Sequence, residues 1–598
     1  MREDTIPTLF QTTAKKYDER VALRKKEYGI WTDISWREYA ENVKHIALGL
    51  LSLGLKKGEC VTLIGENRPE WLYADLAIMS AGGITSAIYT TNSPGQCEYI
   101  IQHSEARFHI AEDEEQLDKV LKTRDNLPNL EKIIIIDMEG LKHFKDPMVM
   151  SIEELAQSGR DLDERDPALF ETHLNEPNPE DTALLIYTSG TTGPPKGAML
   201  SHANILWTTE ALREATPFYE SDELLSFLPL SHIAERMFSV FCPIRYGYTV
   251  NFIENTDTVT QNMVEVSPTV FFAVPRIWEK YYSTIAIRMS DATWLKRSLY
   301  YISLKIGAKD TELKLANKKV PLLLRGIFLL VHFSIFRKLK EKLGFDRVRL
   351  AISGAAPISP DVLRYYHGIG IPLREIYGQT EDCGPTSIHL GENIKTGTVG
   401  QAIPGVEIRI ADDGEILVKG PNVFQGYFKN PEATRETLRD GWLHSGDMGE
   451  LDEEGYLKIT DRKKDLIITA GGKNISPQNI ENQLKFSPYI NDAIVIGDRK
   501  KYLTALIMID EDNVVKYAQD NRIPFTTYAD LSKNPEITRL IAKEVEKVNK
   551  TLAHVETIKK FTLFDKRLDE EDGELTPTMK VKRKYINEMY KDVIDSMY

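Results

Sequence analysis

"YTSGTTGPPKG", residues 187–197, follows directly on the apolar run "TALLI" at 182–186. An apolar run that breaks into glycine, serine and threonine predicts a buried strand that ends in a tight loop. Glycines let backbone N–H groups turn inward, and hydroxyl and ammonium groups add further donors for an oxyanion. The side chains that supply these donors are Thr188, Ser189, Thr191, Thr192 and Lys196. We therefore expect this loop to bind phosphate.

The loop does not have the spacing of a Walker A motif. Counted from Gly190, the positions that hold Gly, Lys and Ser or Thr in a Walker A loop hold Pro195, Lys196 and Gly197 here. Two of the three positions fail, which excludes a P-loop NTPase. The remaining alternative is a surface turn rich in Ser, Gly and Thr that binds no ligand.

Length, charge and cysteine content restrict the class of protein. A chain of 598 residues is too long for one hydrophobic core and predicts about two to four folding units. The formal net charge of -14 argues against a nucleic-acid partner, because such a partner needs a broad basic surface. Four cysteines without CxxC spacing give neither a zinc site nor a disulfide framework. Since "MREDTIPTLFQ" at the N-terminus has no apolar signal segment, we expect a cytoplasmic protein.

The order of apolar runs predicts an α/β protein. Short strands at 60–65 and 132–137 alternate with helical patterns, and this alternation continues through 266–275 to 348–359. From about residue 396 short β runs separated by turns take over, and a last α/β unit follows from about 465. We expect a large N-terminal α/β domain of several subdomains with a β-rich portion, and a small mobile C-terminal α/β domain.

Residues 280–345 combine apolar and basic character. They hold 14 Lys and Arg against 4 Asp and Glu, and include the run "VPLLLRGIFLLVHFSIF" at 320–336. This run is too short and too interrupted to span a bilayer. Basic flanks on an apolar segment favour a helix at a membrane surface, and the alternative is a buried helix whose charged neighbours face solvent.

Six motifs in order along nearly the whole chain carry a resemblance to a known superfamily. They are "YTSGTTGPPKG" at 187, "SFLPLSHIAER" at 226, "SGAAP" at 353, "YGQTE" at 377, "GWLHSGDMGELDEEGYLKITDRKKDLIITAGGKNISP" at 441 and "LTPTMKVKRKYI" at 575. The chain resembles the acyl-adenylate-forming, AMP-dependent synthetases and ligases. Within them, "LPLSHIAER", "VPRIWEK" at 274–280 and the insertion after it look most like long-chain, including bubblegum-type, fatty acyl-CoA synthetases.

The resemblance implies a two-step ligase reaction with ATP, Mg²⁺ and coenzyme A. A fatty acid attacks the α-phosphate of ATP to give acyl-AMP and pyrophosphate, and the thiol of coenzyme A then displaces AMP. Fatty acid, ATP and coenzyme A are the implied partners. Glu381 is implied as the hard oxygen ligand for Mg²⁺, with Thr188 assisting, and Lys196 as part of the phosphate cradle.

The resemblance also assigns residues to the nucleotide. Gly354, Ala355 and Ala356 would form the wall against adenine and Tyr377 would stack on its other face. Thr380 would touch the α-phosphate. The full set implied for ATP or coenzyme A is Thr188, Ser189, Gly190, Thr191, Thr192, Gly193, Lys196, Gly354, Ala355, Ala356, Tyr377, Gly378, Thr380, Asp447, Arg462, Lys464, Gly471 and Gly472. Asp447 and Arg462 are implied for the ribose, and Gly471 and Gly472 for the passage of the pantetheine arm.

By the same resemblance the chain divides at a hinge. Residues 1–460 would bind ATP and the acyl group, 461–464 would form the hinge with Lys464 as pivot, and 465–598 would form the C-terminal domain. Lys580 matches the lysine that this domain brings into the site for adenylation.

Two alternatives belong to other functional classes. An acyl-AMP ligase or an adenylation enzyme would deliver the acyl group to a carrier protein in place of free coenzyme A. A binding scaffold on an inactive fold would have lost at least one chemical residue, yet Lys196, Glu381, Asp447, Arg462 and Lys580 are all present.

Overall fold

The strand expected before the phosphate loop is β8 (Thr182–Thr188), in an eight-stranded sheet of the computed structural model. The structure describes residues 3–188, 194–315, 318–391, 393–470, 473–569, 572–576 and 581–598. The sheet has the order β19-β9-β8-β4-β3-β5-β6-β7. Its other strands are β3 (Cys60–Ile64), β4 (Ile84–Ile88), β5 (Phe108–Ala111), β6 (Lys132–Ile135), β7 (Val149–Ser151), β9 (Lys196–Ser201) and β19 (Gly426–Tyr427). Strands β3 and β6 confirm the two strands expected in this region.

Helices cover this sheet on both faces, which explains why β3, β4 and β5 are buried along their whole length. The surrounding helices are α1 (Ile6–Tyr17), α2 (Trp36–Ser52), α3 (Pro69–Ser80), α4 (Pro94–Ser104), α5 (Glu114–Leu121), α6 (Ile152–Arg165), α7 (Leu169–Leu174) and α8 (His202–Ala215). Helix α8 begins directly after β9, where the Ser201 side chain accepts a hydrogen bond from the backbone N–H of Asn204 at 3.1 Å. This cap fixes the chain on the far side of the phosphate loop.

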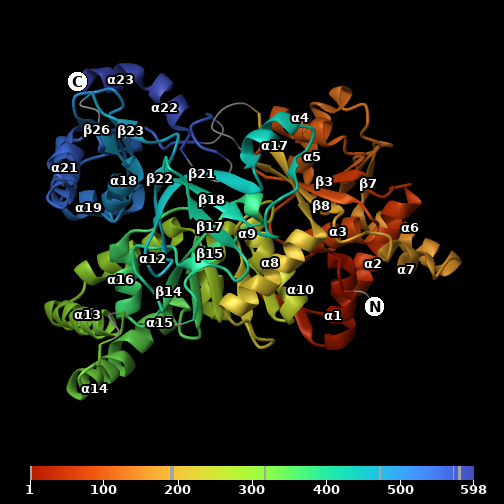
Figure 1. The fold of residues 1–598 in the computed structure, drawn as a ribbon, viewed down its shortest axis with the longest axis horizontal. Helices are drawn as coiled ribbons and strands as arrows, with labels where there is room; N and C mark the ends of the chain where they lie inside the picture. The colour runs from red at the N-terminus through yellow and green to blue at the C-terminus, as the bar shows by residue number, and fades with distance from the viewer. Residues whose placement is uncertain are drawn as a thin grey trace.

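A second sheet of nine strands lies beside the first and has the order β16-β15-β14-β13-β12-β10-β11-β1-β2 (Figure 1). Its strands are β1 (Val21–Glu27), β2 (Ile30–Ser35), β10 (Glu223–Ser226), β11 (Thr249–Phe252), β12 (Val270–Ala273), β13 (Leu350–Ser353), β14 (Leu373–Tyr377), β15 (Ser387–Ile388) and β16 (Gln401–Ala402). Helices α9 (Ile233–Arg236), α10 (Cys242–Tyr246), α11 (Val259–Val266) and α16 (Pro360–Gly368) connect them. The strands expected within 266–275 and 348–359 are β12 and β13.

The β-rich portion expected from about residue 396 is confirmed as a third, five-stranded antiparallel sheet. Its strands are β17 (Glu407–Ile410), β18 (Glu415–Lys419), β20 (Leu438–Arg439), β21 (Trp442–Leu451) and β22 (Leu457–Arg462), and α17 (Pro431–Thr437) packs beside them. Strand β22 ends at Arg462, within the expected hinge at 461–464. Asp461 is buried there, whereas Lys463 and Lys464 are exposed.

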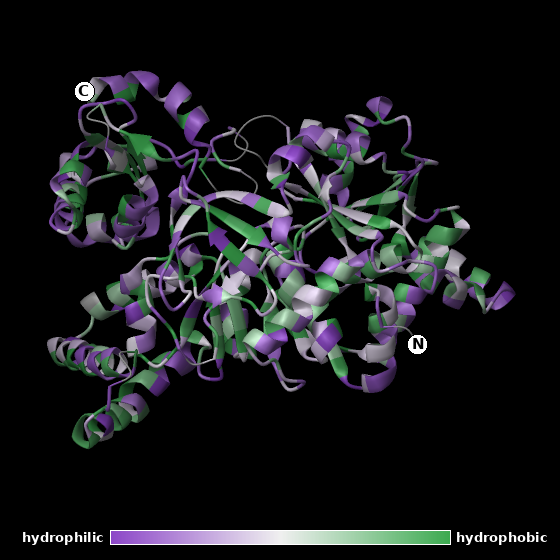
Figure 2. Cartoon of the chain, in the orientation of Figure 1, coloured by the Kyte–Doolittle hydropathy of each residue, from purple (hydrophilic) through white to green (hydrophobic). Residues whose placement is uncertain are grey.

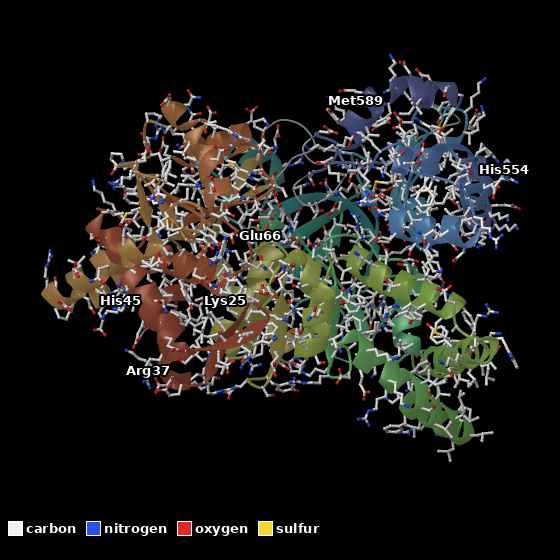
Figure 3. All side chains as sticks on the ribbon, turned by 180° about the vertical axis from the view of Figure 1, so that it is seen from behind. Lys25, Arg37, His45, Glu66, His554 and Met589 are labelled. Atoms are coloured by element: carbon white, nitrogen blue, oxygen red, sulfur yellow. The ribbon has the colours of Figure 1, made fainter. Side chains whose placement is uncertain are left out.

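The described residues from β23 onward form the C-terminal unit, which has hydrophobic cores of its own. Its strands are β23 (Ile467–Ile468), β24 (Asn474–Ile475), β25 (Ile490–Ile496), β26 (Leu503–Ile509) and β27 (Ile558–Leu563). Its helices are α18 (Pro477–Lys485), α19 (Glu511–Asp520), α20 (Tyr528–Lys533), α21 (Pro535–Asn549), α22 (Arg583–Met589) and α23 (Lys591–Ser596). Seen from behind, His554 and Met589 mark this unit, apart from the N-terminal Lys25, Arg37 and His45 (Figure 3).

The described residues of the basic and apolar segment 280–345 are mostly helical. The segment comprises most of α12 (Pro275–Ser290), then α13 (Trp294–Leu315), α14 (Leu322–Val331), a π-helical turn (His332–Phe336) and α15 (Arg337–Leu343). Most of α14 is exposed, so the alternative of a buried helix does not describe it. Among the described residues, none of the helices combines the length and apolarity that crossing a bilayer requires.

Candidate functional site

A cleft of about 2740 Å³ collects most of the residues singled out from the sequence. It is lined by the ends of β8, β13 and β14, by β21 and β22, and by residues of the C-terminal unit. The described candidates on its wall are Thr188, Lys196, Ala355, Ala356, Tyr377, Gly378, Thr380, Glu381, Asp447, Arg462 and Lys464. Segments far apart in the sequence therefore meet at one site.

Strands β8 and β9 hold the two ends of the phosphate loop. Thr188 is the last residue of β8 and Lys196 the first residue of β9, and the two are partners in the antiparallel register. The Thr188 hydroxyl also lies 3.5 Å from the backbone oxygen of Lys196. Ser189, Gly190, Thr191, Thr192 and Gly193 lie outside the described residues. The pairing nevertheless sets both loop ends at the cleft.

Two hydroxyl groups lie close to the carboxylate of Glu381. The Thr188 hydroxyl lies 3.4 Å from its Oε1 atom, and the Tyr427 hydroxyl donates to the same oxygen at 2.8 Å. Burial raises the pKa of Tyr427 well above its usual range, so its phenol stays protonated and remains a donor. The Lys196 ammonium lies 5.0 Å from the centre of the Tyr427 ring. A carboxylate, a hydroxyl and a cation thus converge beside the phosphate loop.

Tyr427 was not singled out from the sequence. It reaches Glu381 because β19 pairs with β9, with Tyr427 opposite Ala198. The two strands are separated by more than two hundred residues, and no local pattern signals this pairing.

The loop after β13 presents small residues to the cleft. Gly354 is buried, and a Cβ atom at this position would lie 2.5 Å from the Ile376 side chain. Ala355 follows with a positive φ of 66°, and both Ala355 and Ala356 are exposed. A non-glycine residue in the left-handed region is uncommon and marks a turn held by its surroundings. The result is a low wall that a flat ring can approach.

Tyr377, Asp447 and Arg462 form a connected group on the wall of the same cleft. The Tyr377 hydroxyl donates to Asp447 Oδ2 at 2.9 Å, and Arg462 Nε lies 3.4 Å from Asp447 Oδ1. Asp447 and Arg462 are partners in the register of β21 and β22. Burial, helped by the Asp447 carboxylate, raises the pKa of Tyr377 well above its usual range. The group therefore offers a neutral phenol, a carboxylate and a guanidinium.

Gly378 and Thr380 occupy the turn between this group and Glu381. A Cβ atom at Gly378 would lie 1.5 Å from the backbone oxygen of Gly384, so only glycine fits. Thr380 is buried and starts a short 3-10 turn (Thr380–Asp382). The Asp382 carboxylate accepts from the backbone N–H of Gln379 at 2.7 Å, which closes the turn.

Glu375 and Glu235 are buried carboxyl groups on the cleft wall that sequence reasoning missed. Burial raises the pKa of Glu375 to about 8, and its Oε2 atom has no hydrogen-bond partner within the described residues. Burial also raises the pKa of Glu235 to about 7, although this side chain accepts from the hydroxyls of Ser226 and Ser239 at 2.7 and 2.6 Å. In the sequence each is an acidic residue next to an arginine in an otherwise largely apolar segment, "HIAERMF" at 232–238 and "IPLREIY" at 371–377.

Helix α12 connects the cleft to the C-terminal unit. Arg276, on the cleft wall, donates to Asn491 Oδ1 at 3.1 Å. Six residues further along α12, the ring of Tyr282 stacks on Phe486 with 4.8 Å between centroids. Past the C-terminal end of α12, Asp291 pairs with Lys516 at 3.2 Å. Of the candidates in that unit, Gly471, Gly472 and Lys580 lie outside the described residues, whereas Thr576 and Val581 line the cleft.

The family of the chain follows from comparison with known proteins. Residues 10–428 match the family described as AMP-binding enzyme, and residues 464–598 match the AMP-binding enzyme C-terminal domain. The chain belongs to the AMP-binding enzyme family. Both the superfamily resemblance and the α/β fold class expected from the sequence are thereby confirmed.

Relatives in this family cover nearly the whole chain. The long-chain-fatty-acid–CoA ligase ACSBG2 of Xenopus laevis is 36% identical over 627 residues, which cover 99% of this chain and 84% of the relative. The long-chain-fatty-acid–CoA ligase FadD15 of Mycobacterium bovis is 36% identical over 574 residues, which cover 95% and 93%. The solved anthranilate CoA ligase AuaEII with anthranoyl-AMP shares the fold, with a TM-score of 0.75 at 19% identity over 99% of this chain and 98% of that chain.

Proposed function

We propose that this AMP-binding enzyme is a long-chain fatty acid–CoA ligase that forms AMP and pyrophosphate. The observation that carries the proposal is the convergence of two groups on one cleft. Thr188, Lys196 and Glu381 form one, suited to phosphate, and Tyr377, Asp447 and Arg462 form the other, suited to a nucleoside. The relatives named long-chain-fatty-acid–CoA ligases support the acyl substrate and the thiol acceptor.

In the first step a carboxylate oxygen of the fatty acid attacks the α-phosphorus of ATP. A P–O bond forms to give acyl-AMP, and the bond to the β-phosphate breaks as pyrophosphate leaves. Lys196 would neutralise charge on the phosphate oxygens, and Thr188 would donate a hydrogen bond to them. Lys580, which resembles the adenylation lysine, would bridge the carboxylate and the α-phosphate. These residues mainly position the two anions in line.

The nucleoside end of ATP would be held by the second group. Asp447 would accept hydrogen bonds from the ribose hydroxyls, with Arg462 close to the same sugar. Adenine would lie between the low wall of Ala355 and Ala356 and the ring of Tyr377. Glu375 is a further buried carboxyl group of the cleft wall, and its Oε2 atom has no hydrogen-bond partner within the described residues.

A magnesium ion fits beside Glu381. A carboxylate oxygen and the Thr188 hydroxyl 3.4 Å from it are hard oxygen ligands of the kind that Mg²⁺ takes in nucleotide sites. When bound, this ion supplies charge neutralisation on the phosphates. In the described part of the chain, no cluster of three or more His, Cys, Asp or Glu side chains suits a metal. We therefore propose that Glu381 shares the ion with ligand phosphates.

In the second step the thiol of coenzyme A attacks the acyl carbonyl of acyl-AMP. A C–S bond forms, the C–O bond to AMP breaks, and the thiol proton passes to solvent. We propose that the C-terminal domain, residues 465–598, turns about a hinge at 461–464 with Lys464 as pivot between the two steps. Gly471 and Gly472 would then border the pantetheine arm. The division is supported by the separate cores of the C-terminal unit and by family matches that end at 428 and resume at 464.

Location is a further part of the proposal. We propose that the enzyme works in the cytoplasm and contacts the inner face of a membrane peripherally through residues 280–345. Support comes from the exposed apolar side chains and the basic excess of this segment.

The product distinguishes the proposal from its alternative, an acyl-AMP ligase or an enzyme that loads a carrier protein. Purified protein is incubated with MgATP, a long-chain fatty acid and free coenzyme A, and the products are separated by mass. The proposal predicts an acyl-CoA thioester and AMP in equal amounts. Accumulation of acyl-AMP without thioester would support the alternative.

A further inference from the structure

Exposed apolar side chains are concentrated in one part of the surface. Of the 19 large apolar side chains that are exposed among the described residues, 11 lie between Trp294 and Phe333 on α13, α14 and the π-helical turn. Helix α14 projects from the body at the lower left of Figure 1, and Figure 2 shows it as strongly apolar. An exposed apolar patch of this kind marks an interaction surface.

The apolar side chains of α14 share one side of the helix. We define the α14 face as Leu322, Leu323, Ile327, Leu329, Leu330 and Phe333. Leu322 and Leu323 are 86% and 77% exposed, and Leu330 and Phe333 are 70% and 61% exposed. At 100° per residue, the members on α14 itself span an arc of about 160°. Such a wide, convex arc suits a fluid environment that surrounds it better than a flat protein surface.

The other side of α14 is attached to the body. Val331 and Phe336 are buried in the second hydrophobic core, and Phe328 packs against it. The ammonium of Lys314, on α13, lies 5.0 Å from the centre of the Phe328 ring. These contacts attach α14 to the second hydrophobic core and to α13 and leave the α14 face exposed.

Exposed cationic residues lie before, within and after the segment that carries the α14 face. We define the basic collar as Lys318, Lys319, Arg325, Arg337 and Lys338, all of which are exposed. Arg337 pairs with Glu341 at 2.9 Å on its own helix. The other four form no ion pair with an acidic side chain within the described residues. This collar stands out because the whole chain carries a net charge of -14.

We propose that the α14 face inserts into the interfacial layer of an anionic lipid bilayer while the basic collar binds the headgroup phosphates. Apolar side chains flanked by Lys and Arg are the combination that holds a helix at such an interface, and attraction to anionic lipid adds to apolar burial. The role that we give to this membrane binding, access to a fatty acid that partitions into membranes, rests on the proposed function. The binding itself does not, because it needs no ATP, fatty acid or coenzyme A.

Vesicle flotation tests the proposal with two pairs of matched variants. Leu322→Ser with Leu323→Ser removes part of the α14 face, and Ile30→Ser with Met589→Ser removes two side chains that are 69% and 59% exposed elsewhere. Lys318→Gln with Lys319→Gln reduces the collar, and Lys559→Gln with Lys560→Gln removes two exposed lysines of the C-terminal unit. Vesicles contain phosphatidylcholine alone or with about one third phosphatidylserine.

We expect the unaltered protein to float with anionic vesicles, and less as salt rises. The variant of the α14 face and the variant of the basic collar should each lower the partition coefficient about tenfold or more, and both controls should stay within about twofold of the unaltered protein. Equal flotation of all variants, or none by the unaltered protein, would overturn the proposal. A dimer in sedimentation velocity that Leu322→Ser with Leu323→Ser splits would overturn it too, in favour of a second copy. Thioester formation on a soluble medium-chain acid without vesicles tests the proposed function separately.

Discussion

The Tyr377 hydroxyl donates to Asp447 Oδ2 at 2.9 Å and so joins the nine-stranded sheet to the five-stranded sheet at the cleft. Tyr377 ends β14 and Asp447 lies within β21, which continues through the turn into β22 and the hinge segment. A ligand that contacts both residues therefore touches both sheets.

Tyr377→Phe removes this hydrogen bond and keeps the ring. We expect the KM for ATP to rise about fivefold, because a hydrogen bond to a charged acceptor contributes about 1 kcal/mol or more. The kcat at saturating ATP should change less. Initial rates of pyrophosphate release over a range of ATP concentrations give both values. Tyr28→Phe, at an exposed phenol far from the cleft, serves as the control. An unchanged KM would remove Tyr377 from the ATP site.

Glu381→Gln replaces a carboxylate ligand with a neutral amide beside the Thr188 hydroxyl. We expect pyrophosphate release to fall about 100-fold or more, and the Mg²⁺ concentration at half-maximal rate to rise. Tyr427→Phe should cause a smaller loss, because it removes only the donor to Glu381. Glu214→Gln, at an exposed position on α8, is the matched control. The same Mg²⁺ dependence in Glu381→Gln as in the unaltered protein would contradict the metal assignment.

Glu375→Gln should change how stability depends on pH. Burial raises the pKa of Glu375 to about 8 from its usual value of 4.5, so the folded protein keeps a proton that the unfolded chain releases. The group is neutral in both states below about pH 4.5. As pH rises towards 8, the unaltered protein should lose stability relative to the variant, by an amount on the order of several kcal/mol.

Denaturant unfolding followed by tryptophan fluorescence measures this effect. All seven tryptophans lie at or before Trp442, so the signal reports on the part of the chain that contains Glu375. The free energies of unfolding are compared at about pH 5, 7 and 8.5. Parallel curves for the unaltered protein and the variant would show that Glu375 does not titrate abnormally.

Tyr282→Ala with Phe486→Ala removes the stacked pair between α12 and the C-terminal unit. We expect faster trypsin cleavage after Lys463 and Lys464, by roughly severalfold, because fewer contacts then hold the unit and both lysines are already exposed. Time courses on gels give the rate. The variant Tyr28→Ala, at an exposed aromatic residue outside this contact, should be cleaved like the unaltered protein. Equal rates for all three would show that the pair does not restrain the unit.

Local patterns in the sequence predicted the elements around the cleft. The strand before the phosphate loop, β12, β13 and the β-rich portion from about residue 396 follow from apolar runs and turn residues. These elements can be predicted because they depend on residues that are close together in the sequence. The convergence of Thr188 with Glu381, 193 residues apart, was expected only through resemblance to a family, because it depends on the packing of two sheets.

The remaining features depend on contacts that no local pattern encodes. Tyr427 reaches Glu381 through the pairing of β19 with β9, and Phe486 reaches Tyr282 across two units. The apolar run of α14 fits a buried helix and a surface helix equally well. Its exposure is decided by where the helix leaves the body, which is a property of the fold around it.

Isotope transfer tests the adenylation mechanism most directly. A long-chain fatty acid labelled with ¹⁸O at both carboxylate oxygens is incubated with enzyme, MgATP and coenzyme A. The ¹⁸O content of AMP, acyl-CoA and inorganic phosphate is then measured by mass spectrometry. The proposed mechanism predicts one ¹⁸O atom in AMP and one in the thioester, because one carboxylate oxygen bonds to the α-phosphorus and leaves with AMP. Unlabelled AMP, or label in inorganic phosphate, would contradict it.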